Sequence, residues 1–393
     1  MSEVIEMDVR TGAVLPEDAA AATLVGRIMT VTGPAVGIVR GDEIIDVTES
    51  FPTVTHLLGE TEPALAVQRT DGPSLGSLEA ILSNSDETRR DPNQPYLLAP
   101  VDLQAIKACG VTFASSMIER VVEEAAKGDP SRAQGIRQEL VQAIGTDLRA
   151  IRPGSDQARE LKALLEGKQL WSQYLEVGLG VDAEIFTKCQ PLGSVGFGAW
   201  VGLHPRSTWN NPEPEVALVI APDGSVRGAV LGNDVNLRDF EGRSALLLGK
   251  AKDNNGSSAL GPFVRLFDES FGLDDVREMK ISLTVKGGDG FQLDASSSLA
   301  MISRDPLDLA RQLFECHHYP DGAVLYTGTM FAPTKDRDKS GEGFTHKQGD
   351  RVEIATSKLG TLTNRVGLAP EIEPWRDGAL ALFRSLAARG IKF

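Results

Sequence analysis

Three acidic residues stand where the two strands of a hairpin would bring them together. Glu213 and Glu215 precede an apolar run at 216–221, and Asp234 follows a second apolar run at 226–231. A Pro-Asp-Gly-Ser segment separates the runs, and it is typical of a hairpin turn because glycine supplies the positive φ that tight turns need. The spacing therefore predicts a patch of carboxylates at the open end of a hairpin.

The register of this hairpin decides which carboxylates meet. A two-residue loop at Asp223 and Gly224 would place Glu213 opposite Asp234, with Glu215 on the same face as Glu213 because strand side chains alternate. Opposed like charges repel, and burial adds a desolvation penalty that a divalent cation would remove. Three carboxylates suit Mg²⁺, with Mn²⁺ and Ca²⁺ as alternatives. A solvated hairpin edge would explain the same residues without metal, and a longer loop would lose the Glu213–Asp234 pairing.

The same stretch resembles the metal-site signature of the fumarylacetoacetate hydrolase superfamily. Its elements occur in the family's order, over about residues 100–370: Glu213-Pro-Glu215, Gly232-Asn233-Asp234, a downstream lysine and Gly261-Pro262. The resemblance implies that Glu213, Glu215 and Asp234 are the metal ligands.

Two lysines compete for the family's lysine position. Hydrolase members often have a G-K-S sequence, which points to Lys250, whereas the spacing to Gly261-Pro262 favours Lys252. We expect Lys252 at the site, as a base, because a lysine beside a cation has its ammonium form disfavoured.

A departure from the family pattern occurs at 110–119. Superfamily members carry N-Y-x-x-H-x-x-E there; Phe113 matches the tyrosine, Glu119 the glutamate, and Ser116 stands where hydrolases carry histidine. That histidine is the family's water-activating base, so its absence favours another chemistry on the same metal. The resemblance places Glu119 among the catalytic residues and Ser116 in substrate binding. Without it, Glu119 would be interpreted as an exposed helix residue next to Arg120.

Four more residues complete the predicted site. Lys188 ends a segment like the family's F-x-K strand, and Thr329 ends a T-G-T whose last threonine contacts substrate and is counted as catalytic. Ser297 lies in a polar run that reaches toward substrate in the family, and Arg206 could meet a substrate carboxylate. The alternatives are a solvent-exposed Lys188 and a purely structural loop around Arg206.

Three further residues are candidates for roles around the site. Arg238 and Asp239 resemble the family's R-D pair, which is expected to orient Asp234. His346 is a candidate late-chain site residue, although a surface histidine explains it more simply.

Composition excludes several partners. The chain has 393 residues and a formal net charge of −15, which disfavours nucleic acid and anionic membranes. Its three cysteines form no CxxC pair, so a reduced cytoplasm is the expected setting. The N-terminal stretch lacks the apolar core of a signal peptide, and no run approaches the ~18 apolar residues of a transmembrane helix.

Strands and tight turns dominate residues 96–366, with a helical, charged insert at about 128–178. The pattern predicts a small N-terminal domain at 1–93 and a catalytic domain at 94–393. The resemblance implies an α+β fold, a mixed β-roll of the fumarylacetoacetate hydrolase type, assembled as a homodimer or homotetramer. The insert is expected to cover the site, to form an oligomer contact or to be inert surface.

Within the superfamily, the chain looks most like the sugar-acid dehydratases, through G-V-T-F at 110–113 and H-P-R-S-T-W-N-N-P-E-P-E at 204–215. The implied reaction converts a 2-keto-3-deoxy-pentonate into 2-oxoglutarate semialdehyde. Mg²⁺ would bind the C1 carboxylate and C2 ketone, Lys252 would take the C3 proton, and Glu119 would assist loss of the C4 hydroxyl. Alternatives are a metal-dependent hydrolase or decarboxylase of an acylpyruvate-type acid, and a non-catalytic metal-binding protein.

Overall fold

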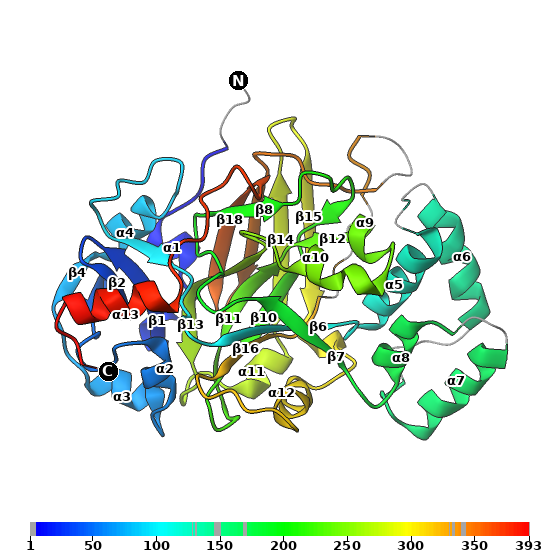
Figure 1. Cartoon of the computed structure of the whole chain (residues 1–393), viewed down its shortest axis with the longest axis horizontal. Coiled ribbons are helices and arrows are strands. Elements are labelled where there is room, and N and C mark those ends of the chain that lie inside the picture. Colours follow the sequence, from blue (N-terminus) through cyan, green and yellow to red (C-terminus); the bar gives the residue numbers. More distant parts are fainter. Residues whose placement is uncertain are drawn as a thin grey trace.

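Two β-sheets pack against each other in a computed structural model of the chain (Figure 1). The structure describes residues 5–127, 129, 132–144, 151–167, 171–329, 331, 335–338 and 343–392. Strands β10, β11 and β13 of the larger sheet contact β14, β17 and β18 of the smaller one. This mixed sheet architecture agrees with the fold class predicted from the sequence.

The larger sheet runs from the N-terminal strands to the strand that carries Lys188. Its strands, in spatial order, are β4 (Ser74–Ser77), β3 (Glu43–Asp46), β2 (Gly33–Arg40), β1 (Leu24–Thr30), β13 (Ser258–Leu266), β11 (Val226–Asp234), β10 (Pro214–Ile220), β16 (Ala323–Tyr326), β6 (Ala105–Gly110) and β7 (Glu184–Cys189), with β5 (Tyr96–Leu98) paired to β1. Neighbours are antiparallel except β16 and β6, which are parallel.

The smaller sheet covers one face of the larger one. Its strands, in spatial order, are β15 (Gln292–Ser298), β14 (Lys280–Lys286), β17 (Arg351–Thr356), β18 (Gly360–Leu368) and β8 (Trp200–Leu203). A separate short ribbon pairs β9 (Asn210–Asn211) with β12 (Asn236–Leu237), on either side of the predicted metal hairpin.

Helices flank the sheets on both sides (Figure 1). One group surrounds the N-terminal strands: α1 (Thr11–Val14), α2 (Val54–Leu58), α3 (Pro63–Arg69), α4 (Leu78–Asn84) and α13 (Ala379–Ala388). The lobe at the opposite end contains α5 (Ala114–Ala126), α6 (Ala133–Ile144), α7 (Asp156–Gly167) and α8 (Gln173–Leu179). Short helices α9 (Arg238–Glu241), α10 (Leu248–Lys252), α11 (Leu273–Arg277) and α12 (Pro306–Phe314) complete the chain.

The central strand β10 is buried along its whole length because both faces of the sheet are covered. Leu218 packs in the core between the two sheets, whereas Ala217 and Val219 join a second core that includes residues of α2 and α3. A strand covered on both faces is a near-continuous apolar run, as the sequence of β10 is. Polar groups at the end of this strand are therefore held by a rigid, water-excluding frame.

The N-terminal strands continue the larger sheet, since β1 pairs with β13 at Leu24 and Arg265. A domain boundary at residue 93 remains a prediction. The insert at 128–178 is largely helical wherever the structure describes it.

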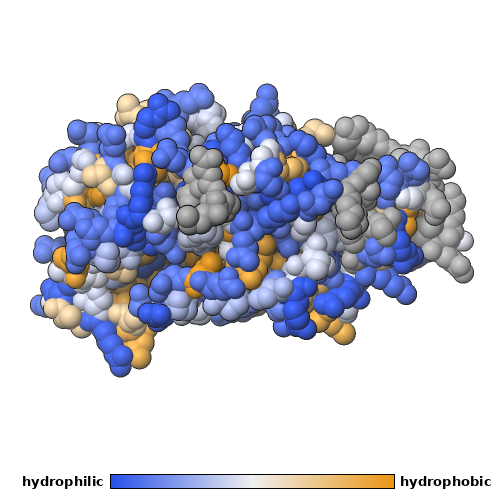
Figure 2. Space-filling view, turned by 90° about the horizontal axis from the view of Figure 1, so that it is seen from above, coloured by the Kyte–Doolittle hydropathy of each residue, from blue (hydrophilic) through white to orange (hydrophobic). Residues whose placement is uncertain are grey.

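The upper face of the molecule shows mainly hydrophilic side chains, with hydrophobic ones in small separate groups (Figure 2). None of the helices in the described ranges combines the length and apolarity that a bilayer span needs.

Candidate metal centre

The hairpin has the predicted pairing at its open end. Pro214 pairs with Asn233, and the Asp234 amide donates to the Glu213 carbonyl at 3.0 Å. Glu213 and Asp234 are therefore opposite each other, as expected from a short turn, and Glu215 follows on the same face as Glu213.

The turn itself differs from the prediction. The Ala221 amide donates to the Ser225 carbonyl, which leaves a three-residue loop, 222–224, in place of two residues. Gly224 has φ +83°, the left-handed conformation that glycine adopts without strain. An irregularity between Val219 and Ile220 offsets the added residue, so the pairing survives the longer loop.

The three predicted ligands form one buried cluster. Glu213, Glu215 and Asp234 each offer an oxygen within 4.8 Å of the other two. These three residues are almost completely buried, with exposed fractions of 4%, 1% and 1%, respectively. Three carboxylates removed from water at this spacing carry a large electrostatic cost unless positive charge is present.

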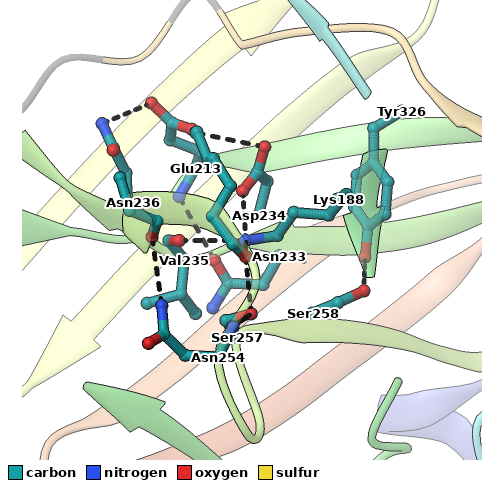
Figure 3. Close-up of polar contacts among 12 residues, drawn as sticks. Lys188, Glu213, Asn233, Asp234, Val235, Asn236, Asn254, Ser257, Ser258 and Tyr326 are labelled. Atoms are coloured by element: carbon teal, nitrogen blue, oxygen red, sulfur yellow. Dashed lines mark hydrogen bonds and ion pairs between the residues drawn. The ribbon is translucent and has the colours of Figure 1, made fainter. Parts of the chain in front are cut away.

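Two buried lysines supply part of that charge. Lys252 Nζ lies 2.6 Å from Glu213 Oε2 and 3.2 Å from Asp234 Oδ2. Lys188 Nζ lies 2.7 Å from Asp234 Oδ1 and also donates to the carbonyls of Val235 and Lys252 (Figure 3). Lys188 does not line the cavity described below. Its expected contact with substrate is therefore corrected to a contact with Asp234.

The burial of residues in α10 shows which of the two candidate lysines lies at the site. Lys252 ends this helix buried against the carboxylates, whereas Lys250 is exposed. Burial lowers the pKa of Lys252, but the Asp234, Glu213 and Glu241 carboxylates outweigh it and raise the pKa well above its usual value. The ammonium form is therefore favoured while those carboxylates face it.

Glu215 is the predicted ligand with the least compensating positive charge. Its carboxylate accepts from the Gly328 amide at 2.6 Å, and no ion pair to it occurs among the described residues. Burial raises the pKa of Glu215 well above its usual value, and the negative charges of Asp234 and Glu213 add to this. Compensating positive charge is therefore lacking mainly around Glu215.

The other two ligands are better compensated. Burial raises the pKa of Glu213, against the opposing effect of Lys252 and Arg120. Burial also favours the neutral form of Asp234, but Lys188 and Lys252 outweigh it, so the pKa of Asp234 is lowered. These three carboxylates fit a hard divalent cation, because oxygen donors suit Mg²⁺ and the poorly compensated Glu215 needs positive charge.

Three residues around the cluster were not predicted. Arg120 of α5 approaches Glu213 Oε1 at 2.8 Å and also pairs with Glu241. Asn236 donates to the same Glu213 oxygen at 3.0 Å. Asn236 follows Asp234 by two residues, so alternation along an extended chain was a usable signal. No such sequence signal marks Glu241, because only the folding of the chain brings this residue close to the cluster.

A cavity opens beside the carboxylates. Elements from distant parts of the chain line it, including Val111, Ser116, Tyr174, Glu184, Phe186 and Thr329. Tyr174 belongs to α8, so the helical insert contributes to the wall. This contact favours the expected covering role of the insert over the expectation of inert surface.

Glu119 lines the cavity but is fully engaged. Arg137 donates to its two oxygens at 2.5 and 2.7 Å, and Arg238 approaches Oε2 at 3.3 Å. Arg238 also stacks over the Trp209 ring at 4.2 Å. Glu119 is buried, in contrast to the exposed position that its sequence context alone suggests.

The expected Arg238–Asp239 pair does not orient Asp234, because Arg238 binds Glu119 instead. Asp239 accepts from the Ser207 hydroxyl at 2.8 Å and the Thr208 amide at 3.1 Å. Lys188 and Lys252 are the residues that hold Asp234.

Ser116 and Thr329 both reach the cavity. The Ser116 hydroxyl donates to the Phe113 carbonyl at 2.8 Å and accepts from the Phe113 amide at 3.2 Å, which closes the first turn of α5. The Thr329 hydroxyl donates to the Pro214 carbonyl at 3.1 Å, beside the ligand strand.

Besides Lys188, three expected site residues lie outside the lining of this cavity, as far as the described residues define it. Ser297 belongs to β15, in the smaller sheet. Arg206 is exposed, 5.9 Å from the Phe240 ring. His346 is buried, with Nδ1 3.1 Å from Asp350, so the surface-histidine alternative is wrong as well. Their placement depends on packing that local sequence does not encode.

Comparison with known proteins agrees with the resemblance in the sequence. Residues 209–367 match the family described as fumarylacetoacetate (FAA) hydrolase C-terminal. A "Probable 2-keto-3-deoxyxylonate dehydratase" of Haloferax volcanii is 30% identical over 213 residues, which cover 54% of this chain and 68% of the relative. A "2-dehydro-3-deoxy-D-arabinonate dehydratase" of Saccharolobus solfataricus is 29% identical over 209 residues, 53% of this chain and 66% of the relative.

Solved structures share the fold. A 2-keto-3-deoxy-D-arabinonate dehydratase complexed with magnesium and 2,5-dioxopentanoate matches with a TM-score of 0.62 at 21% identity, covering 88% of this chain and 99% of that one. The apo form matches with a TM-score of 0.61. The chain belongs to the fumarylacetoacetate hydrolase family. Among the relatives it matches are dehydratases of keto-deoxy sugar acids, in agreement with the predicted branch.

Proposed function

We propose that this protein is a divalent-cation-dependent dehydratase, a lyase that converts a 2-keto-3-deoxy-pentonate into 2-oxoglutarate semialdehyde. The observation that carries the proposal is the buried cluster of Glu213, Glu215 and Asp234 at a cavity that Ser116 lines. By the family resemblance, Ser116 stands where the hydrolases carry histidine. The names of the relatives add the substrate class.

Glu213, Glu215 and Asp234 would hold the cation, with Mg²⁺ as the expected ion and Mn²⁺ or Ca²⁺ as alternatives. When bound, the cation supplies Lewis-acid chemistry to the oxygens of a 2-keto acid. Lys188 and Lys252 keep Asp234 ionised and fixed in orientation, which prepares it to act as a ligand.

Lys252 is the proposed base for the C3 proton. Lys252 lines the cavity, and its Nζ atom lies 2.6 Å from Oε2 of the proposed ligand Glu213. To accept a proton, the amine must first be neutral, which requires other positive charge to neutralise the carboxylates that now favour its ammonium form.

Glu119 is assigned a positioning role. Both of its oxygens accept from guanidinium groups, which makes it a poor proton donor. It links Arg137 of α6 to Arg238 of α9 and so ties the helical lobe to the metal hairpin. Thr329 and Ser116, which both line the cavity, are proposed to contact substrate.

The test is a panel of 2-keto acids with Mg²⁺, read by aldehyde formation. We expect turnover of 2-keto-3-deoxy-arabinonate or 2-keto-3-deoxy-xylonate, loss of turnover on chelation and recovery with added Mg²⁺. Cleavage of an acylpyruvate with no action on either pentonate would replace the dehydratase by a hydrolase or decarboxylase. Full turnover after exhaustive chelation would remove the cation from the proposal.

We further propose a cytoplasmic homodimer or homotetramer, as the family resemblance implies. Light scattering on the purified full chain measures the oligomeric state directly. A monomer at micromolar concentration would contradict it.

A further inference from the structure

Glu184 projects into the cavity from the first residue of β7. Its backbone pairs with Gly110 of β6, and both residues line the cavity. A Cβ atom on Gly110 would overlap Glu184 Oε2. The carboxyl group therefore occupies the space that a side chain at position 110 would fill, and the glycine makes room for it.

This carboxyl group has no fixed partner. No hydrogen bond or ion pair joins it to any residue in the described ranges, whereas Glu119, Glu213 and Glu241 on the same cavity are each paired with an arginine. A half-buried carboxyl group without such a partner is free to bind a group that enters the cavity.

Charged groups face Glu184 from several elements. They are Arg120 of α5, Glu213 of β10, Glu241 of α9 and Lys252 of α10, with the Cys109 thiol beside it on β6. Burial raises the pKa of Glu184 to about 7, helped by Glu241 and opposed by Arg120 and Lys252. Near neutral pH the group is present in both forms, which suits an acid–base catalyst.

We propose that Glu184 protonates the departing C4 hydroxyl, as the catalytic acid of the dehydration. This assignment rests on the proposed function. The C3–H bond breaks, its proton passes to Lys252, and its electron pair becomes the C3–C4 double bond. The C4–O bond breaks, its pair stays on oxygen, and the Glu184 proton completes a water molecule. Moving one proton from C5 to C3 then gives the C4–C5 enol, and transfer of the enol O–H proton to C4 gives the semialdehyde.

The other acidic groups fit this role less well. Both oxygens of Glu119 accept from arginines. Glu241 pairs with Arg120 and lies 3.6 Å from Lys252 Nζ. Glu213, Glu215 and Asp234 are the proposed ligands. Among the described residues, Glu184 is therefore the one carboxyl group lining the cavity that is neither a proposed ligand nor ion-paired.

The test separates proton abstraction from loss of the hydroxyl. Glu184→Gln should lower pentonate turnover by about 10²–10⁴-fold while C3–H exchange with deuterated solvent and Mg²⁺ affinity stay near the wild-type values. A substrate with acetate in place of the C4 hydroxyl needs little acid assistance, so the variant should process it nearly normally. Wild-type kcat should fall as the pH rises through the pKa of Glu184 and the group loses its proton, and the variant should lack this fall.

Three further variants keep the test decisive. Gly110→Ala, which fills the space of the carboxyl group, should give the same pattern independently. Glu176→Gln, an exposed residue of α8 that pairs with Lys162 outside the cavity, is the matched control and should turn over normally. Glu184→Asp, which keeps an acid, replaces Glu184→Gln if the latter does not fold.

The outcomes distinguish this inference from the function beneath it. If wild type neither exchanges C3–H nor dehydrates any pentonate, the proposed function fails. If wild type is active and Glu184→Gln keeps more than about a third of its turnover, or loses C3–H exchange in proportion, the role of Glu184 as catalytic acid is overturned.

Discussion

Two buried carboxylates in this molecule have opposite surroundings. Asp350 lies beside β17, where Arg337 donates to both of its oxygens at 2.6 and 2.7 Å and the Lys347 amide donates at 2.9 Å. Glu215, on β10, accepts from one backbone amide and has no cationic partner among the described residues. Burial favours the neutral form of both, yet the pKa of Asp350 is lowered by Arg337 and His346, whereas that of Glu215 is raised.

The difference separates a structural ion cluster from a ligand site. Around Asp350 the chain supplies its own compensation, because Arg337 also pairs with Asp289, and Lys347 pairs with Asp289 and Asp338. Around Glu215 the compensation stops short, and a cation from solution would complete it. Burial of acids alone therefore does not identify a metal site; the useful sign is burial with incomplete pairing.

The largest effect is expected at the base. Lys252→Met should lower turnover by about 10²–10⁴-fold with little change in substrate affinity, since proton abstraction at C3 belongs to the transition state. Lys250→Met, two residues away and exposed, is the matched control and should be near normal. Steady-state kinetics with C3–H exchange measures both. An inactive Lys250→Met beside an active Lys252→Met would transfer the role to Lys250.

Glu215→Gln and Asp350→Asn test the comparison itself. Removing a charged ligand should raise the Mg²⁺ concentration needed for half-maximal activity by more than about 100-fold. Asp350→Asn should destabilise the fold without changing that concentration, because Asp350 belongs to a closed ion cluster. Titrations of activity with Mg²⁺ at a fixed substrate concentration measure the half-maximal Mg²⁺ concentration of both variants. Equal increases in the two variants would contradict the difference proposed between Glu215 and Asp350.

Lys188→Met should act mainly on stability. The side chain is fully buried and paired with Asp234, so its removal leaves a buried carboxylate with one partner fewer. Breaking such a pair costs about 3–5 kcal/mol, which urea denaturation would detect. We also expect added Mg²⁺ to recover part of this loss in Lys188→Met but not in Arg337→Met. Equal recovery in both variants would argue against a cation beside Asp234.

The smallest effect is expected at Ser116. Its hydroxyl bonds within the first turn of α5, and it replaces the hydrolase histidine. Ser116→Ala should therefore keep more than about a tenth of dehydratase activity, well short of the loss expected for a general base. A loss of about 10²-fold or more in kcat, with normal folding by circular dichroism, would show that this serine takes part in the chemistry.

Much of the metal hairpin could be predicted from local sequence. Strand alternation placed Glu213, Glu215 and Asp234 together, and Pro-Asp-Gly marked the turn. The predicted loop length was wrong because a register irregularity between Val219 and Ile220, which the alternating sequence pattern does not mark, offsets one added loop residue.

Residues brought in by long-range folding were the difficult ones. Arg120 and Glu184 reach the cavity from α5 and β7, far away in sequence, and neither was predicted as a site residue. Ser297 was misplaced because its strand joins the smaller sheet. Lys188 was placed correctly near the site, but its partner is Asp234, since full burial leaves its ammonium group facing that carboxylate.

Direct cation binding tests the central claim. Calorimetric titration of chelator-treated protein with Mg²⁺, supported by electron paramagnetic resonance with Mn²⁺, should show one site per chain in wild type and in Asp350→Asn. The combined Glu213→Gln, Glu215→Gln and Asp234→Asn variant should show none, because all three charged oxygen ligands are gone. Absence of binding in folded wild type, or unchanged binding in the combined variant, would contradict the assignment of this hairpin as a metal centre.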